Sequence, residues 1–366
     1  MARGLRIAFF GSSLVSAYWN GAATYYRGII RALHARGHAV TFYEPDAYER
    51  QQHRDIPDPA WARVVVYSAE GEDPVRRALE KARDADVLIK ASGVGVHDAL
   101  LEEGVLEVRR PGAQVIFWDV DAPATLERLA GDPADPFRPL VPRYDLILTY
   151  GGGRPVVEGY TAYGARRCVP IYNAHDPDTH HPVAPEARFA GDLGFLGNRL
   201  PDREARVESF FLAAAEAMPD RRFLIGGAGW ETRALPPNVR LVGHVYTRDH
   251  NAFNCSLTAV MNICRESMAR YGYSPATRVF EAAGAGACLI TDAWEGVEEF
   301  LAPGEEILVA RDGAEVAAHL AGLTPARARE IGQAARRRAL AEHTYARRAA
   351  QCEDLLGVRA AEVSRR

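Results

Sequence analysis

Short runs of apolar residues alternate with amphipathic stretches along the whole chain. Strands that are buried on both faces appear as short apolar runs, and the stretches between them have helical spacing. We expect strands at 5–10, 39–43, 63–67, 86–90, 114–118, 145–149, 167–171, 192–196, 222–226, 239–242, 258–263, 287–291 and 306–309. We expect helices that include 22–36, 73–83, 155–163, 202–217, 275–284, 295–301, 313–321, 325–341 and 345–356. The pattern predicts an α/β protein with two doubly wound, Rossmann-like domains facing each other across a cleft.

The stretch at 173–186 interrupts this pattern, because it contains three prolines and lacks apolar periodicity. We interpret it as a linker between an N-terminal domain at 1–172 and a C-terminal domain at 187–343. The final segment at 344–366 is expected to carry a helix that crosses back to the first domain.

Composition limits the class of protein. The chain has 366 residues, of which 48% are hydrophobic and 25% charged, as in globular proteins. Its 48 acidic against 44 basic residues disfavour a partner that is nucleic acid. Five cysteines without a C-x-x-C pair disfavour a disulfide framework or structural zinc site. We see no signal peptide and no transmembrane segment, and therefore expect a cytoplasmic protein.

Candidate chemistry in the first domain follows its strands, because ligands of such sheets bind beyond the carboxyl ends. Gly21 opens a helix after the first strand and could approach a phosphate, although a plain turn explains it equally well. Asp119, Asp121 and His97 follow neighbouring strands and could deprotonate a hydroxyl nucleophile. The alternatives are that Asp121 caps a helix before Pro123 and that His97 is a surface histidine.

Candidate binding residues in the second domain come in three groups. Arg199 and Arg203 lie at a helix start, where planar donors suit a diphosphate, unless they are a solvated pair. Gly227 and Trp230 could hold a nucleotide with the indole ring stacked on it, or form a tight turn with a buried Trp.

The third and densest group lies at 262–299. Ser274 and Pro275 resemble a helix start, which would expose the N–H groups at 276–278, including those of Thr277 and Arg278, to phosphate oxygens. Glu281 is an acid among apolar neighbours, and its two acceptors suit ribose hydroxyls; the alternative is an exposed helix acid.

Two further clusters are weaker. His175, His180 and His181 lie close together in the linker, but we expect no metal site there. The arginines from Arg327 to Arg348 are interpreted as solvated helix faces, with a basic face for an anionic acceptor as the alternative.

The motif Arg278-x-x-Glu281-Ala282-x-x-x-Gly286, followed by a strand and the segment 294–304, resembles the donor half of group 1 glycosyltransferases. The segment 273–281 is most similar to the spore maturation protein CgeB-like branch. The first-domain glycine loop at Asn20-Gly21-Ala22 and the segment 197–200 resemble the same superfamily. The likeness covers most of the chain and is densest at 262–310.

This resemblance implies the GT-B fold, with an acceptor-side first domain and a second domain that binds a nucleotide-diphosphate sugar. It implies that Glu281 binds the ribose, that Arg199 or Arg203 meets the diphosphate, and that Asp119 or Asp121 lies on the acceptor side. The sequence departs from the superfamily at Tyr273, where a second glutamate is usual.

We therefore expect a metal-independent glycosyltransferase with no required cofactor, which uses UDP- or GDP-sugar as co-substrate and a hydroxyl-bearing acceptor. The acceptor is a glycan, lipid, protein or small molecule that the sequence does not identify. The alternatives are a non-catalytic nucleotide- or carbohydrate-binding protein on the same scaffold, motivated by Tyr273, and a nucleotide-sugar epimerase.

Overall fold

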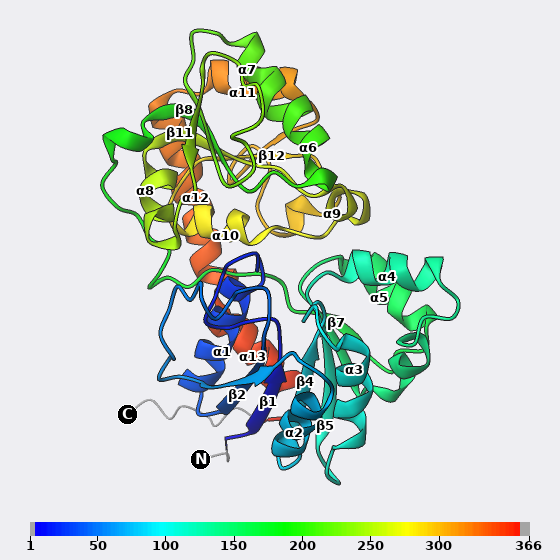
Figure 1. Cartoon of the computed structure of the whole chain (residues 1–366). Helices are drawn as coiled ribbons and strands as arrows, with labels where there is room; N and C mark the ends of the chain where they lie inside the picture. Colours follow the sequence, from blue (N-terminus) through cyan, green and yellow to red (C-terminus); the bar gives the residue numbers. More distant parts are fainter. Residues whose placement is uncertain (1–3, 359–366) are drawn as a thin grey trace. The chain divides into compact units, whose positions relative to one another are not determined.

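The computed structural model describes residues 4–358 and divides the chain into two compact units (Figure 1). Unit 1 comprises Met1–Tyr172 and Tyr345–Arg366, and unit 2 comprises Asn173–Thr344. Residues 1–3 and 359–366, which include the end of the predicted C-terminal segment, lie outside the described residues. The segment at 173–186, expected as a linker, belongs to unit 2.

Unit 1 is built on a seven-stranded sheet with the order β3-β2-β1-β4-β5-β6-β7, in which each described pair is parallel. Its strands are β1 (Arg6–Phe10), β2 (Ala39–Asp46), β3 (Arg63–Ser68), β4 (Val87–Ala91), β5 (Gln114–Asp119), β6 (Leu146–Thr149) and β7 (Cys168–Pro170). Its α-helices are α1 (Ala23–Ala35), α2 (Asp73–Ala82), α3 (Asp98–Glu107), α4 (Ala122–Gly131), α5 (Gly153–Ala162) and α13 (Tyr345–Leu355). The strand order reverses beside β1, which is where doubly wound sheets bind ligands.

Unit 2 has a six-stranded parallel sheet with the order β10-β9-β8-β11-β12-β13. Its strands are β8 (Gly191–Leu196), β9 (Phe223–Gly226), β10 (Val239–Gly243), β11 (Leu257–Asn262), β12 (Leu289–Asp292) and β13 (Leu308–Ala310). Its α-helices are α6 (Pro201–Val207), α7 (Ala213–Ala217), α8 (His250–Cys255), α9 (Glu266–Tyr271), α10 (Thr277–Gly284), α11 (Gly313–Gly322) and α12 (Pro325–Glu342). A π-helical segment at Glu208–Leu212 joins α6 to α7.

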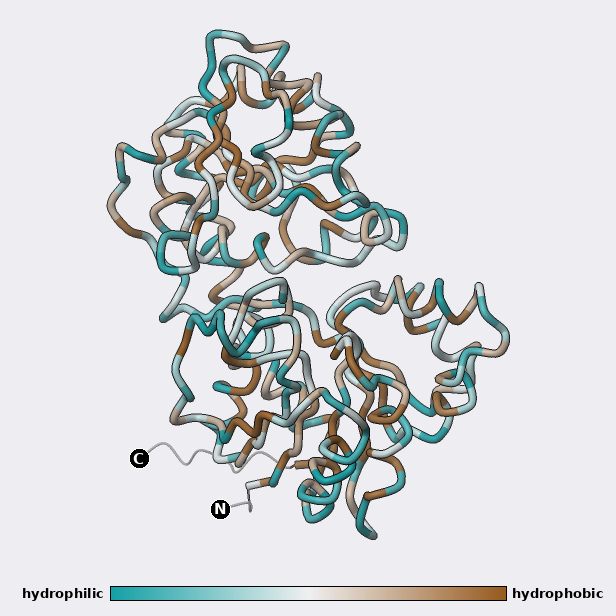
Figure 2. The backbone as a smooth tube through the Cα atoms, viewed as in Figure 1, coloured by the Kyte–Doolittle hydropathy of each residue, from teal (hydrophilic) through white to brown (hydrophobic). Residues whose placement is uncertain are grey.

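Each unit has its own apolar core along its sheet, where Figure 2 shows the hydrophobic segments concentrated. In unit 2, Leu193, Phe195, Phe211 and Phe223 are fully buried between the sheet and its helices. Burial of such side chains contributes about 1.5–3 kcal/mol each, so the core holds the loops at the strand ends in place. No helix within residues 4–358 has the length and apolarity to cross a membrane.

The structure corrects two predicted elements. The predicted helix at 295–301 is wrong, because only a 3-10 turn forms at Val297–Glu299 after Gly296, which has a φ of 87°. The predicted helix at 275–284 begins two residues later, at Thr277, because Ala276 keeps an extended ψ of 150°. The pattern also did not single out α3, α4, α8 and α9, which are short or lack a strong apolar stripe.

The C-terminal helix α13 packs on α1 within unit 1. A Cβ atom at Gly28 of α1 would lie 2.2 Å from the Tyr345 ring, so the helices approach closely only because residue 28 is glycine. Arg36 and His38 at the end of α1 both contact the Glu353 carboxylate of α13. The Glu353 pKa stays below its usual value, because these two cations outweigh its burial.

We expect Gly28→Ala to destabilise unit 1 by about 2 kcal/mol, since overpacking a tight helix contact costs about 1–3 kcal/mol. Gly131→Ala is the matched control, because nothing lies within 4 Å of its Cβ position at the end of α4. Urea unfolding measures both variants. Equal stability of Gly28→Ala and the wild type would contradict the close α1–α13 contact.

His175 is a buried histidine at the start of unit 2. Its Nδ1 lies 3.2 Å from the His343 carbonyl oxygen, and its Nε2 is buried without a hydrogen-bond partner in the described structure. Burial lowers the His175 pKa; His180 and Arg336 lower it further, whereas the His343 carbonyl and Asp176 raise it. The folded protein therefore holds this ring neutral.

Unit 2 should lose stability as the pH falls from 7 to 5. Below a pH of about 6.5 His175 is protonated in the unfolded chain but stays neutral in the folded one. This difference lowers the free energy of unfolding by up to about 2 kcal/mol at pH 5. Urea unfolding at pH 7 and pH 5 should show that the free energy of unfolding depends less on pH in His175→Gln than in the control His181→Gln, an exposed neighbour. An unchanged pH dependence in His175→Gln would refute this role.

Candidate functional site

Two arginines of unit 2 meet at the carboxyl end of β8. A Cβ atom on Gly197 would lie 2.9 Å from Nη2 of Arg203, on α6, and 3.1 Å from Nη2 of Arg278, on α10. Both guanidinium carbons lie 5.4 Å from the centre of the buried Phe195 ring. A glycine at 197 and an aromatic ring at 195 thus leave room for two cations side by side.

The charges of this arginine pair are poorly compensated within the described part of the chain. Arg203 donates from Nη2 to the Asn198 carbonyl, while its Nε is buried without a partner. No hydrogen bond or salt bridge is found for Arg278 among residues 4–358. Burial, followed by the charge of the neighbouring Arg278, lowers the pKa of Arg203 to about 10. Burial also lowers the Arg278 pKa, against an opposing effect of Glu281.

Two half-buried cations that repel each other favour an anion that can bind both. Guanidinium groups bind phosphate oxygens through paired hydrogen bonds, which are about twice as strong as neutral ones. The arrangement therefore suits a diphosphate better than a single carboxylate.

Gly227 brings the loop after β9 against the loop after β8. Its φ is 121°, and a Cβ atom there would lie 2.4 Å from the Gly197 carbonyl oxygen. The Gly197 carbonyl also accepts a 2.8 Å hydrogen bond from Nε1 of Trp230. Gly227 is therefore needed for the shape of the site, whether or not it contacts a ligand.

The stacking role expected for Trp230 is not supported. Its side chain is 1% exposed and lies edge-on to Phe195 at 6.3 Å between ring centres. Trp230 instead fits the alternative interpretation of a tight turn with a buried Trp. Its hydrogen bond to the Gly197 carbonyl stabilises the loop after β8.

Arg199 differs from Arg203 because its charge is already paired. It donates to the Glu204 carboxylate at 2.6 Å and to the Thr232 hydroxyl at 3.2 Å. The hydrogen bond to Glu204 raises the Arg199 pKa. Of the two predicted diphosphate ligands, Arg203 is the one that makes no salt bridge within the described residues, whereas Arg199 is paired with Glu204.

The start of α10 is held by hydrogen bonds. The Thr277 hydroxyl donates to the Asn173 side chain at 3.0 Å, and the Asn173 amide donates to the Pro275 carbonyl at 3.2 Å. The buried Ser274 hydroxyl donates to the Gly272 carbonyl. The hydroxyls of Ser274 and Thr277 therefore shape this turn, and the backbone N–H groups of the first helical turn remain the donors available to a ligand.

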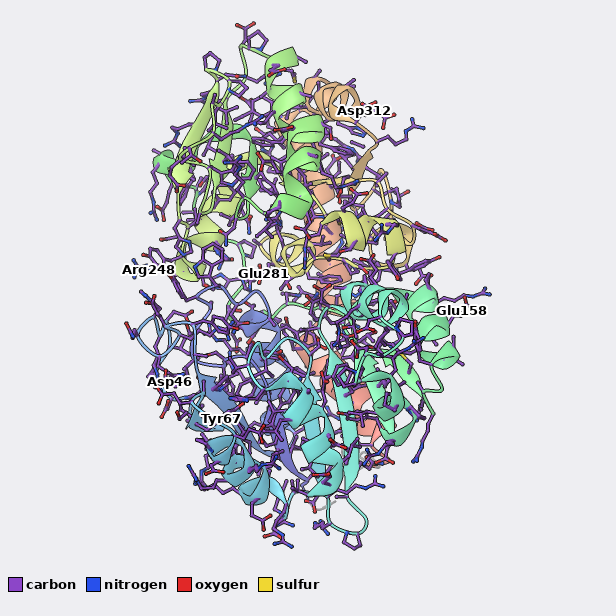
Figure 3. All side chains as sticks on the ribbon, turned by 45° about the vertical axis from the view of Figure 1, so that its right-hand side comes forward. Asp46, Tyr67, Glu158, Arg248, Glu281 and Asp312 are labelled. Atoms are coloured by element: carbon purple, nitrogen blue, oxygen red, sulfur yellow. The ribbon has the colours of Figure 1, made fainter. Side chains whose placement is uncertain are left out.

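Glu281 is buried on α10 (Figure 3), which excludes the interpretation as an exposed helix acid. It is 9% exposed, and its Oε1 lies 3.6 Å from Nε2 of the buried His180. His250, at the start of α8, completes a cluster in which one ligand atom of each residue lies within 4.8 Å of the others. Burial lowers the His250 pKa, although Glu281 raises it.

Asp119 in unit 1 is fully buried at the end of β5. Its Oδ1 accepts from the Ser92 hydroxyl at 2.7 Å and from the Asp121 N–H at 3.0 Å, and its Oδ2 accepts from the Tyr160 hydroxyl. Burial, followed by the Asp119 charge, raises the Tyr160 pKa. These bonds make Asp119 an anchor of the strand end.

The other acceptor-side candidates have different surroundings. Asp121 is half-buried before α4, and its side chain makes no capping hydrogen bond, so the helix-cap alternative does not hold. His97 has a φ of 54°, and its Nε2 lies 2.9 Å from the Ala69 carbonyl. Lys90, at the end of β4, is fully buried and donates to Asp98. Of the two predicted acids, Asp121 is half-buried and Asp119 fully buried.

Gly21 is exposed, and nothing lies within 4 Å of its Cβ position. The preceding loop is ordered by Glu44, which accepts from the Leu14 N–H at 2.6 Å and the Ser13 hydroxyl at 3.0 Å. Asn20 adds hydrogen bonds to the carbonyls of Ser13 and Ser16. Packing does not require glycine at 21, whereas Glu44 has a structural role.

Sequence reasoning missed three residues of the unit 2 site. The sequence indicated only that Phe195 belongs to a strand and that Asn173 belongs to the linker. His250 belonged to no motif. A signal existed for Phe195, because it is the aromatic residue of the strand that ends just before Gly197. Nothing in the sequence relates His250 to Glu281, since their contact depends on the packing of α8 beside α10.

Residues 203–354 match the model of a family described as glycosyl transferase-like. No curated protein matches the chain in sequence.

Several solved structures have a similar fold. Sucrose-phosphate synthase from Thermosynechococcus elongatus is 17% identical, with a TM-score of 0.67 over 96% of this chain and 98% of that one. HepE from Anabaena, in complex with UDP and glucose, is 12% identical, with a TM-score of 0.70 over 96% and 99%. An alpha-glucosyltransferase in complex with UDP-glucose and DNA containing an abasic site is 13% identical, with a TM-score of 0.70 over 97% and 100%.

The predicted GT-B fold with two Rossmann-like domains is confirmed by these structures. The family match covers less than half of the chain, over residues 203–354, and agrees with the prediction of a glycosyltransferase.

Gly227→Ala should weaken nucleoside diphosphate binding by at least about tenfold, because the added methyl group would push the Gly197 loop out of place. Gly304→Ala is the control: it lies in the same unit with a positive φ of 81°, but nothing lies within 4 Å of its Cβ position. Calorimetric titration with UDP and GDP measures the effect. Equal losses in both variants would show that backbone strain alone is responsible.

Proposed function

We propose that the protein transfers a sugar from a nucleotide-diphosphate sugar to a hydroxyl-bearing acceptor without a catalytic metal. The observation that carries this proposal is the pair of half-buried arginines, Arg203 and Arg278, which meet at Gly197, together with the buried carboxylate of Glu281 on the same helix as Arg278. A ligand with two negative phosphates and a nearby diol would satisfy all three side chains.

The donor diphosphate binds the two guanidinium groups and the first turn of α10. Both Nη2 atoms lie around Gly197, so one phosphate can accept from both arginines. The N–H groups at the start of α10 and its helix dipole add to the same attraction. Glu281, one turn further along α10, accepts from the ribose hydroxyls.

Catalysis follows from the charge that develops on the leaving diphosphate. As the bond between the sugar and the phosphate breaks, negative charge grows on the phosphate oxygens beside Arg203 and Arg278. Fixed cations stabilise this charge without rearranging, which supplies what a divalent metal supplies in other transferases.

On the acceptor side, we propose that Asp121 takes the proton of the attacking hydroxyl. Its carboxylate is less buried than that of Asp119, whose oxygens accept three hydrogen bonds. Asp119 positions the strand end, and His97 stays a weaker candidate because its Nε2 is bonded to Ala69.

UDP and GDP are the donor nucleotides that we propose, with UDP favoured because two solved structures of this fold contain UDP or UDP-glucose.

We also propose that the chain belongs to the CgeB-like branch. A carboxylate lies near the position where the superfamily's second glutamate is missing, because the Tyr273 hydroxyl donates to Glu295 at 3.2 Å. Acceptors to be tested are glycans, lipids, proteins and small molecules, with DNA as a comparison.

Binding of UDP and of uridine distinguishes the role of Arg278 from that of Glu281. Arg278→Ala should lower UDP affinity by about 10²-fold, since each charged hydrogen bond contributes about 1.5–3 kcal/mol, and should leave uridine affinity unchanged. Glu281→Gln should lower the affinity for both ligands by about tenfold. Arg221→Ala is the control, because it is an exposed arginine paired with Asp192. Calorimetry measures all four proteins, and UDP affinity unchanged in Arg278→Ala would contradict the site.

Activity is tested by incubating the protein with UDP-, GDP-, ADP- and dTDP-sugars and measuring nucleotide release with and without acceptors. Loss of product in Asp121→Asn, with donor binding kept, supports the transferase. Binding without turnover would indicate a non-catalytic binding protein, and sugar conversion without an acceptor would indicate an epimerase. The absence of binding to any of these donors would refute the proposal.

A further inference from the structure

His180, His250 and Glu281 converge from three separate segments of unit 2. His180 lies in the segment 173–186, His250 begins α8, and Glu281 lies on α10. One ligand atom of each lies within 4.8 Å of the others. Two imidazoles and a carboxylate form a donor set typical of Zn²⁺ and related transition-metal ions, and a poor set for Mg²⁺.

The hydrogen bonds of His180 determine which of its nitrogens is free. Its Nδ1 lies 3.0 Å from the Thr179 hydroxyl oxygen, and that hydroxyl lies 3.2 Å from the Asp176 carbonyl, to which it can donate. The hydroxyl hydrogen is then used, so His180 Nδ1 carries the proton and donates to Thr179. Nε2 is therefore left with its lone pair.

This lone pair faces another acceptor. His180 Nε2 is buried without a hydrogen-bond partner in the described structure, and it lies 3.6 Å from Oε1 of Glu281. The side chains of His180 and Glu281 are 2% and 11% exposed, so bulk water reaches neither well. Two buried acceptors face each other, and a cation between them would satisfy both.

We propose that His180, His250 and Glu281 bind one Zn²⁺-class transition-metal ion, and that this ion inhibits the protein by occupying Glu281. The His180–Thr179–Asp176 chain orients the ligand as second-sphere hydrogen bonds do in known metal sites. Inhibition rests on the proposed function, because a metal-bound Glu281 carboxylate no longer accepts from the ribose. Metal and nucleotide therefore compete.

Co²⁺ tests the site directly, because three protein ligands in a low-symmetry site give it an intense visible absorption band. Titrating the full-length, tag-free protein with Co²⁺ should give this band at one ion per chain, and Zn²⁺ should remove it. His180→Gln and His250→Gln should each weaken Co²⁺ binding at least about tenfold. His181→Gln is the matched control, since His181 is an exposed neighbour whose Nδ1 lies beside the Pro182 carbonyl.

Thermal unfolding without metal checks that each variant is folded. Zn²⁺ should raise the melting temperature of the wild type and of His181→Gln but not that of His180→Gln. A missing Co²⁺ band, or an equal band in His180→Gln, overturns the metal site and leaves the contact between His180 and Glu281 as a structural one.

Competition between Zn²⁺ and UDP is measured separately, by the affinity for UDP. Zn²⁺ should raise the apparent Kd of UDP at least about tenfold in the wild type and leave it unchanged in His180→Gln. If Co²⁺ binds but UDP does not bind even without metal, the metal site stands and the proposed donor site fails. If Co²⁺ or Zn²⁺ and UDP bind independently of each other, the metal site is supported and the inhibitory role of the metal is overturned.

Discussion

The unit 2 site depends on the repulsion between two guanidinium groups that the fold holds beside Gly197. Like charges at this distance destabilise a folded protein unless something offsets them, and burial increases the cost. Part of the offset comes from the Phe195 ring, which both guanidinium carbons approach at 5.4 Å. The nearby acids Asp202 and Glu281 oppose the lowering of the Arg203 and Arg278 pKa values, but neither arginine makes a salt bridge within residues 4–358, so a bound anion would offset the remaining repulsion.

Nearby charges show the contrast. Arg206 binds the buried Asp292 carboxylate, which also accepts from the Cys264 N–H, so this network is complete without a ligand. Arg199 is likewise paired with Glu204. Arg203 and Arg278 differ from Arg206 and Arg199, because neither makes a salt bridge within the described residues.

The same contrast separates the two units. At the end of β5, Asp119 has three donors and its hydrogen bonds are internal. On α10, Arg278 is half-buried and Glu281 is buried, and both have few internal partners. Unsatisfied hydrogen-bonding capacity, rather than burial alone, therefore separates the proposed ligand-binding residues from residues that stabilise the fold.

Much of this protein was determined by sequence alone. The apolar runs located the strands of both sheets, because β strands buried on both faces leave a pattern that depends only on local residue order. The segment around Arg278 and Glu281 was also predicted, since a helix start and an isolated acid are local features. Tertiary structure alone decided that Trp230 is buried and that Asp119 is saturated with hydrogen bonds. It also decided that His180 and His250 meet Glu281, because such contacts join segments far apart in sequence and depend on how helices and loops pack on the sheet.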